Sequence, residues 1–171
     1  GGKAYPVHIK LDTGMNRLGF KELEIDALVD QLIDQGHLKV HSVFSHLAAS
    51  DEPEQDEFTR GQIQLFDKLS NKLIKSLGYP VIRHILNSAG IERFSDSQYD
   101  MVRLGIGLYG ISPVNPSQLH NISTFKSTVT QVKDVARGGT VGYGRKGKAE
   151  REMKIAVVPV GYADGFSRAL G

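Results

Sequence analysis

The stretch MVRLGIGLYG, residues 101–110, combines an apolar strand-like run with a cation and two glycines. An arginine such as Arg103, placed among residues of a barrel wall, is costly unless a planar polar group meets its donors. Gly105 and Gly107 follow at once and leave backbone N–H groups uncovered, so this stretch is suited to a flat, phosphorylated ligand. The alternative is an Arg103 that forms an ion pair with a carboxylate of the core.

Strand-like and helix-like segments alternate ahead of residue 105. We expect strands over 7–11, 39–44, 81–86 and 100–104, and helices over 21–35, 53–77 and 88–94. The first two helices carry apolar residues at helical spacing and are followed by Gly36 and Gly78, which favour helix ends. No hairpin signal joins the strands, so the pattern is typical of βα units on a parallel sheet.

Polar residues gather where the expected strands end. They are Lys10 to Arg17 after the first strand, Ser45 and His46 after the second, Asn87 and Ser88 after the third, and Arg103 in the fourth. A (β/α)8 barrel builds its active site at that rim, and a doubly wound sheet also binds ligands there. The clustering favours an α/β enzyme without deciding between the two folds.

The composition changes beyond Tyr109. Residues 112–123, SPVNPSQLHNIS, are rich in Pro, Ser and Asn and are typical of a linker. Strand-like runs follow at 127–135, 140–143 and 154–160, with a turn expected at Gly138-Gly139. We therefore expect a first domain over 1–114, a linker over 115–123, and the beginning of an all-β domain over 124–171.

Composition indicates a soluble, cytoplasmic protein that binds neither nucleic acid nor a membrane. The 171 residues are 40% hydrophobic and 23% charged, and the net charge of +2 gives no field for nucleic acid. There is no cysteine, which removes disulfides and thiolate chemistry and suggests an intracellular site. No apolar run approaches 18 residues, and no metal site is expected.

Several single residues can be interpreted either as structural or as functional. Ser88 could cap the helix that follows it or hold a phosphate. His46, at a strand end, could be structural or could stay neutral as a partner of Arg103. Tyr143 and Tyr162 lie beside glycines and could be packed aromatics or, with a lowered pKa, exposed phenols that act as bases.

Lys10 presents a similar choice. A buried lysine requires a neutralising partner or a lowered pKa. It could pair with Asp12, two residues on, or it could be chemically modified and position Arg17.

Six motifs together resemble one family, the pyridoxal 5′-phosphate (PLP)-dependent alanine racemases of fold type III. They are KLDTGMNRLGF, HLAASDE, LNSAG, MVRLGIGLYG, VGYGR and VPVGYADGFSR. Their order and spacing match the family over nearly this whole chain, but over only about half of a family protein. The run VFSHLAASDEPEQDEFTRGQIQLF also resembles the variant fused to a cell-wall-peptide ligase. The resemblance implies the C-terminal half of a (β/α)8 TIM barrel followed by the start of a β domain.

The resemblance also implies roles for the cofactor-binding residues. Arg103 would face the pyridine nitrogen of PLP, with His46 bonded to it. Ser88 and the backbone of Gly105 and Ile106 would hold the phosphate.

Further roles concern the substrate. Arg17 would lie near the phenolic oxygen of PLP and the alanine carboxylate, held by Lys10, which is often carbamylated in the family. Tyr143 would take the proton of L-alanine in the active site of the opposite subunit of a homodimer. The entrance channel for substrate would be lined by Tyr162, Asp51, His84 and Arg168.

The implied activity is interconversion of L- and D-alanine through a PLP aldimine by two bases, which supplies D-alanine for peptidoglycan. The family's Schiff-base lysine precedes the matched region, so we expect residues 1–171 alone to be inactive. Two alternatives stay open: a broader amino-acid racemase or other fold-III PLP enzyme, and a non-catalytic PLP-binding module.

Overall fold

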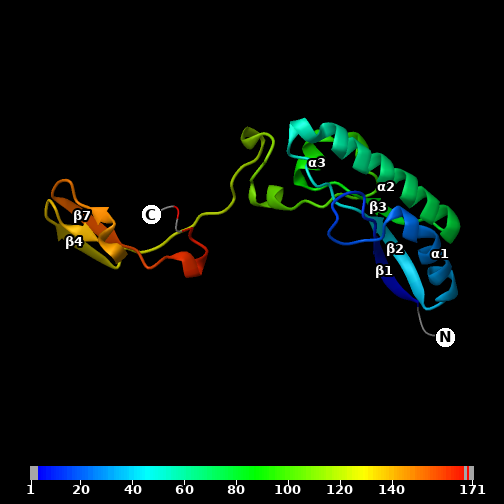
Figure 1. Cartoon of the computed structure of the whole chain (residues 1–171), viewed down its shortest axis with the longest axis horizontal. Helices are drawn as coiled ribbons and strands as arrows, with labels where there is room; N and C mark the ends of the chain where they lie inside the picture. The colour runs from blue at the N-terminus through cyan, green and yellow to red at the C-terminus, as the bar shows by residue number, and fades with distance from the viewer. Residues whose placement is uncertain (1–3, 168, 170–171) are drawn as a thin grey trace. The chain divides into compact units, whose positions relative to one another are not determined.

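The computed structural model describes residues 4–167 and 169, and the chain divides into two compact units between Ser123 and Thr124. The first unit contains a parallel sheet of β1 (Tyr5–Lys10), β2 (Leu38–Phe44) and β3 (Ile82–His84), in that order. Helices α1 (Ile25–Asp34) and α2 (Asp56–Leu77) connect successive strands, and α3 (Ser88–Arg93) follows β3 (Figure 1). The expected βα units and parallel sheet are confirmed.

The helices begin and end where the sequence supplies the chemistry for it. Pro53 opens a 3-10 turn directly ahead of α2, and Gly78 closes that helix with φ 73°, a left-handed conformation that favours glycine. Short 3-10 turns also lie at Glu22–Glu24, Ser95–Ser97, Ile106–Tyr109, Pro116–Gln118, Tyr143–Arg145 and Tyr162–Asp164. No helix in the described part of the chain has the length and apolarity to cross a membrane.

The hydrophobic core of the first unit lies between the sheet and its helices. Ile9 and Val43 pack there with Phe66, Leu69 and Leu73 of α2, all nearly inaccessible to solvent. Burial of side chains of this size contributes about 1.5–3 kcal/mol each. This core fixes the helix-facing side of the strands, and alternation turns the intervening residues to the other face.

Register places those intervening residues in two rows on the other face of the sheet. Lys10 aligns with Phe44, which aligns with His84; one row below, His8 aligns with Ser42. A register shift between Val7 and His8 interrupts the β1–β2 ladder. The row nearer the carboxyl ends of the strands therefore carries the polar side chains closest to the expected site.

The expected fourth strand, 100–104, does not form. The backbone N–H groups of Asp100 and Arg103 donate to the carbonyls of Arg83 and Leu86, at 3.1 and 3.0 Å. These two donors are three residues apart, whereas a strand edge presents its donors at every second residue, so no regular ladder can develop. The segment runs beside β3 as an irregular extension, and β3 itself is shorter than the expected 81–86.

The second unit consists of short antiparallel pairs. β4 (Gln131–Val135) pairs with β7 (Met153–Val157), and β5 (Thr140–Val141) pairs with β6 (Gly147–Lys148). The expected strand over 140–143 stops early because Gly142 and Gly144 adopt φ values of 77° and 65°, which turn the chain. The expected β character of this region is confirmed, with shorter strands.

Candidate active site

Polar groups that follow β2 and β3, together with one from the irregular segment at 100–104, line one hollow of about 470 Å³. His46 and Asp51 come from the loop after β2, Ser88 from the start of α3, and Arg103 from the irregular segment that follows. The remaining lining residues are Asn87, Ala89, Leu104, Gly105, Ile106 and Pro113. The hollow thus lies at the carboxyl ends of parallel strands, where this architecture places active sites.

Arg103 is held by neutral acceptors, so the alternative of an ion pair with a core carboxylate is wrong. Its Nη1 donates to His84 Nδ1 at 2.5 Å, and its Nη2 donates to the Ser45 carbonyl at 2.5 Å and the Ile85 carbonyl at 3.2 Å. Nη2 also lies 3.2 Å from His46 Nδ1, as expected for that pair. None of the ion pairs within residues 4–167 and 169 involves Arg103.

One donor of Arg103 is left over. Its two terminal nitrogens meet the acceptors above, whereas its Nε–H has no acceptor among the described residues. The guanidinium carbon lies 5.3 Å from the ring centroid of Phe44, so the fork is also supported by an aromatic ring. A rigid cation with one free donor is suited to a ring nitrogen that offers a lone pair.

Both histidines beside Arg103 are kept neutral. Burial, the Arg103 charge and His8 lower the pKa of His84 to about 4. Burial and the charges of Arg103, Arg17 and Lys10 lower the pKa of His46 as well. Near neutral pH, each imidazole can therefore accept a hydrogen bond from the guanidinium.

Ser88 joins the start of α3 to the glycine stretch. Its Oγ accepts hydrogen bonds from the backbone N–H groups of Gly105 and Gly107, at 3.0 and 3.1 Å. A Cβ added at Gly107 would lie 2.8 Å from Leu104 Cδ1 and 3.4 Å from Ser88 Oγ, so a side chain there would crowd this cradle. A hydroxyl with converging backbone amides is the donor set that phosphate binds.

The helix cap is Asn87, one residue ahead of the expected Ser88. Asn87 Oδ1 accepts from the Gly90 N–H at 2.9 Å and from Ser50 Oγ at 2.7 Å. Asn and Ser cap helices equally well, and only Ser88 was expected in that role. With Asn87 as the cap, the Ser88 hydroxyl is available for the glycine stretch.

Lys10 and Asp12 do not form the ion pair that was one of their expected alternatives. Asp12 Oδ1 instead accepts from the backbone N–H groups of Gly14 and Asn16, at 3.1 and 2.9 Å, and shapes the loop that bears Arg17. Burial alone would raise the pKa of Asp12, but these bonds and the charges of Lys21 and Lys10 lower it. Lys10 is half-buried and Arg17 exposed, and both are near enough to His46 to affect its pKa.

The residues expected in the entrance channel are distributed differently. Asp51 is exposed at the hollow, but His84 is only 5% exposed and lies against Arg103 and stacks on Phe44, not at an opening. Tyr143 and Tyr162 lie in the second unit, 100% and 68% exposed, and Arg168 lies outside the described residues. The support that His84 gives to Arg103 was not expected, because a histidine at the end of a strand does not by itself indicate which side chain it contacts.

Arg93, which was not among the expected site residues, holds the loop that carries Asp51. Arg93 Nη1 donates to the Ser50 carbonyl at 2.9 Å, and its Nη2 pairs with Asp56 Oδ1 at 2.6 Å. These contacts join α3 to the loop ahead of α2.

The residues of this hollow are chemically suited to a flat, phosphorylated heteroaromatic ring. Arg103, whose Nε–H has no acceptor among the described residues, lines the same hollow as the cradle of Ser88 and Gly105. The first would meet a ring nitrogen and the second a phosphate, which are two features of a single cofactor.

Comparison with known proteins assigns both units to the same family. Residues 1–113 match the family model "Alanine racemase, N-terminal domain", and residues 122–171 match "Alanine racemase, C-terminal domain". The alanine racemase of Symbiobacterium thermophilum is 38% identical over 173 residues, which is 99% of this chain and 46% of that protein.

Solved structures give the same result. The alanine racemase of D-cycloserine-producing Streptomyces lavendulae has a TM-score of 0.86 at 32% identity, over 97% of this chain and 46% of that one. The alanine racemase of Bartonella henselae, with covalently bound pyridoxal phosphate, has a TM-score of 0.79 at 29% identity, over 98% and 46%. The chain spans about half the length of the curated relatives it matches. With both family models matched in order and the barrel-rim site formed, this chain belongs to the alanine racemase family.

Proposed function

We propose that the full-length protein is a PLP-dependent alanine racemase that interconverts L- and D-alanine and supplies D-alanine for peptidoglycan. The observation that carries this proposal is the free Nε–H of Arg103 beside the Ser88 cradle. When bound, PLP would supply the electron sink that stabilises the carbanion left after α-proton removal.

The described residues divide the binding of PLP among them. Arg103 would donate from Nε to the pyridine nitrogen, while His84, His46 and three backbone carbonyls hold its other nitrogens. A guanidinium donates a hydrogen bond but does not give up its proton near neutral pH. The ring nitrogen would therefore stay unprotonated, unlike that of a PLP decarboxylase with an acid at this position.

The phosphate and the substrate would be held by separate groups. Ser88, Gly105 and Ile106 would bind the phosphate. Arg17, held by a Lys10 that is open to carbamylation, would face the phenolic oxygen and the alanine carboxylate. The charges of Arg17 and Lys10 both lower the pKa of His46, which lines the hollow, and this supports their placement near it.

The second unit would supply the base for L-alanine. Tyr143 is fully exposed on a turn between Gly142 and Gly144, and in a two-fold homodimer it would serve the partner's active site. Tyr162, Asp51 and Arg168 would line the entrance channel, and a lysine elsewhere in the full-length protein would serve the other face. Residues 1–114 would be the second half of the barrel, 115–123 a linker and 124–171 the start of the β domain, in a cytoplasmic enzyme.

The test is racemisation by the full-length protein loaded with PLP. L-alanine and D-alanine would each be incubated with the protein, and the enantiomers separated by chiral chromatography, with L-serine as a measure of substrate breadth. We expect Arg103→Lys to lose PLP affinity and racemisation, and the exposed Arg151→Lys to change neither. A folded, PLP-loaded protein that leaves both enantiomers of alanine unchanged would contradict the proposal.

A further inference from the structure

We propose that Ser42 and His8 are positioning residues that fix the tautomer of His84 and thereby hold the guanidinium of Arg103 in place. The inference rests on the proposed function only where it concerns PLP affinity. It starts from a continuous line of hydrogen bonds that runs from the site along the face of the sheet opposite its helices.

The first bond sets the direction of the line. A guanidinium has donors and no acceptor, so His84 Nδ1 must offer its lone pair to Arg103. A neutral imidazole with an unprotonated Nδ1 carries its proton on Nε2. The low pKa of His84 is consistent with this neutral form.

The second and third bonds continue in the same direction. His84 Nε2 lies 3.2 Å from Ser42 Oγ, and His8 Nδ1 lies 2.6 Å from the same oxygen. If His84 Nε2–H donates to Ser42, the serine hydroxyl donates its one hydrogen to His8 Nδ1. In the opposite arrangement, with His8 donating, no acceptor among the described residues would receive the serine hydrogen.

Burial makes this choice consequential. Ser42 is 1% exposed and His84 5% exposed, so neither can exchange its partner for bulk water. A buried polar atom that loses its partner is destabilising. With Ser42 in place, the Nε2–H tautomer satisfies both ring nitrogens of His84, whereas the Nδ1–H tautomer would direct a hydrogen at Arg103 Nη1.

The consequence is a guanidinium with one fixed orientation. His84 is stacked on Phe44, with ring centroids 5.1 Å apart, so its plane is set independently of the hydrogen bonds. Ser42 and His8 then stabilise, from the Nε2 side, the tautomer in which Nδ1 accepts from Arg103. A fixed Nη1 contact keeps the plane of Arg103 constant, and with it the direction of its Nε–H.

The primary experiment reads the tautomer directly. In the full-length protein labelled with ¹⁵N-histidine, long-range ¹H–¹⁵N correlation spectra distinguish protonated from unprotonated ring nitrogens, and His84→Asn identifies the His84 signals. We expect His84 to carry its proton on Nε2 in the PLP-free protein as well as in the loaded one. We expect Ser42→Ala to give a mixture of tautomers and Ser42→Thr, which keeps the hydroxyl, to restore the single form.

Two further variants separate positioning from folding. His8→Asn keeps an acceptor near Nδ1 and should preserve the tautomer, whereas His8→Leu should disturb it. His41, whose ring contacts that of His8 edge-on at 5.7 Å, is the control, and His41→Asn should leave His84 unchanged. Because His8 is exposed, its variants serve if Ser42→Ala does not fold.

PLP affinity is the second readout. Equilibrium dialysis should show about tenfold weaker PLP binding for Ser42→Ala, since a hydrogen bond to a charged group is weakened. A wild-type His84 protonated on Nδ1, or a tautomer unaffected by Ser42→Ala and His8→Leu, would overturn the inference. Absence of alanine racemisation would overturn the proposed function and leave the tautomer result standing.

Discussion

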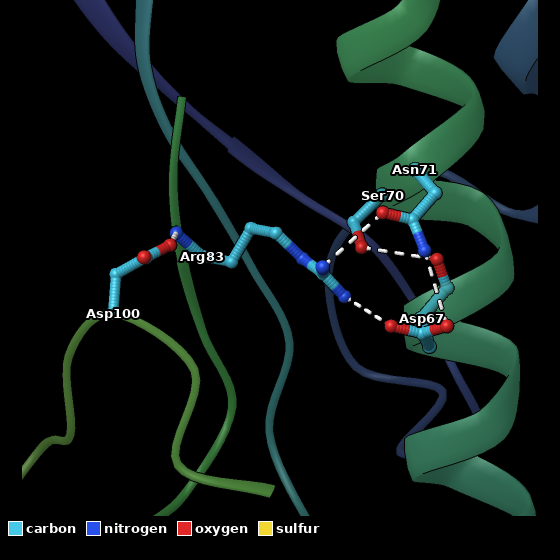
Figure 2. A network of polar contacts seen from close by, with 5 residues as sticks. All are labelled: Asp67, Ser70, Asn71, Arg83 and Asp100. Carbon is cyan, nitrogen blue, oxygen red and sulfur yellow. Dashed lines mark hydrogen bonds and ion pairs between the residues drawn. The ribbon is translucent and has the colours of Figure 1, made fainter. Parts of the chain in front are cut away.

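Arg83 of β3 and Asp67 of α2 form an ion pair that joins the sheet to the long helix covering it (Figure 2). Arg83 Nη1 also donates to Asn71 Oδ1 at 3.1 Å, and its backbone N–H donates to Asp100 Oδ2 at 2.8 Å. Its guanidinium carbon lies 4.2 Å from the ring centroid of Tyr99. The arginine thus connects α2 to the segment that leads into Arg103.

Removal of Arg83 should destabilise the first unit. Its side chain is only 17% exposed, so Arg83→Ala removes the ion-pair partner of Asp67 and the donor to Asn71 Oδ1, and we expect a loss of roughly 1–3 kcal/mol in unfolding free energy. The exposed pair of Lys68 and Glu22 gives the control, since Lys68→Ala should cost about 0.5 kcal/mol or less. Urea unfolding of the full-length protein measures both, and equal losses would contradict the assigned role.

Gly19 should not tolerate a side chain. It has φ 111°, and a Cβ there would lie 2.9 Å from Asp12 N and 2.9 Å from Lys10 O. Both neighbours are backbone atoms that bond to Phe20, so Gly19→Ala should cost roughly 1–3 kcal/mol and displace the loop bearing Arg17. Gly61, in α2 with open space around it, is the matched control, and Gly61→Ala should stabilise by about 0.5–1 kcal/mol. Thermal unfolding compares the two variants, and a melting temperature of Gly19→Ala equal to or above that of Gly61→Ala would show that the strain is absent.

Stability should fall in acid because His84 resists protonation. Its pKa is about 4 in the folded protein against 6.5 for the ordinary side chain. Its contribution is therefore complete above pH 6.5 and is lost as the pH falls toward 4, because the unfolded chain binds the proton first. The difference is at most about 3 kcal/mol. Unfolding free energies at pH 7 and 4.5 should converge in His84→Asn, and an equal pH dependence in wild type and variant would refute the assignment.

Tyr143→Phe should separate the two faces of the reaction. Without the phenol, racemisation should stop in both directions, while the lysine face would still exchange the α-proton of D-alanine. Proton NMR in deuterated water, on the PLP-loaded full-length protein, follows both exchanges. Tyr109→Phe, a change of the same kind at an exposed tyrosine of the first unit, should leave both rates intact. Retained exchange of L-alanine, with D-alanine inert, would show that the faces are assigned the wrong way round.

Local patterns in the sequence were enough for the α/β class, the positions of α1 and α2, and the gathering of polar residues at strand ends. Apolar spacing, Pro53 and Gly78 act within a few residues of where they occur, so their structural effects are local. The motifs around Ser88 and Arg103 indicated a phosphate and a cationic fork for the same reason. The expected strand over 100–104 failed because its pairing depends on β3, which lies about twenty residues earlier.

What the tertiary structure alone decided is which groups meet Arg103. Its acceptors come from His84, Ser45, His46 and Ile85, which lie 18 to 58 residues away in the chain. Their convergence depends on the register of β2 and β3, which aligns Phe44 with His84. Hydrophobic periodicity determines which face of a strand is buried, but a polar residue finds its partner only when separate strands are brought into register.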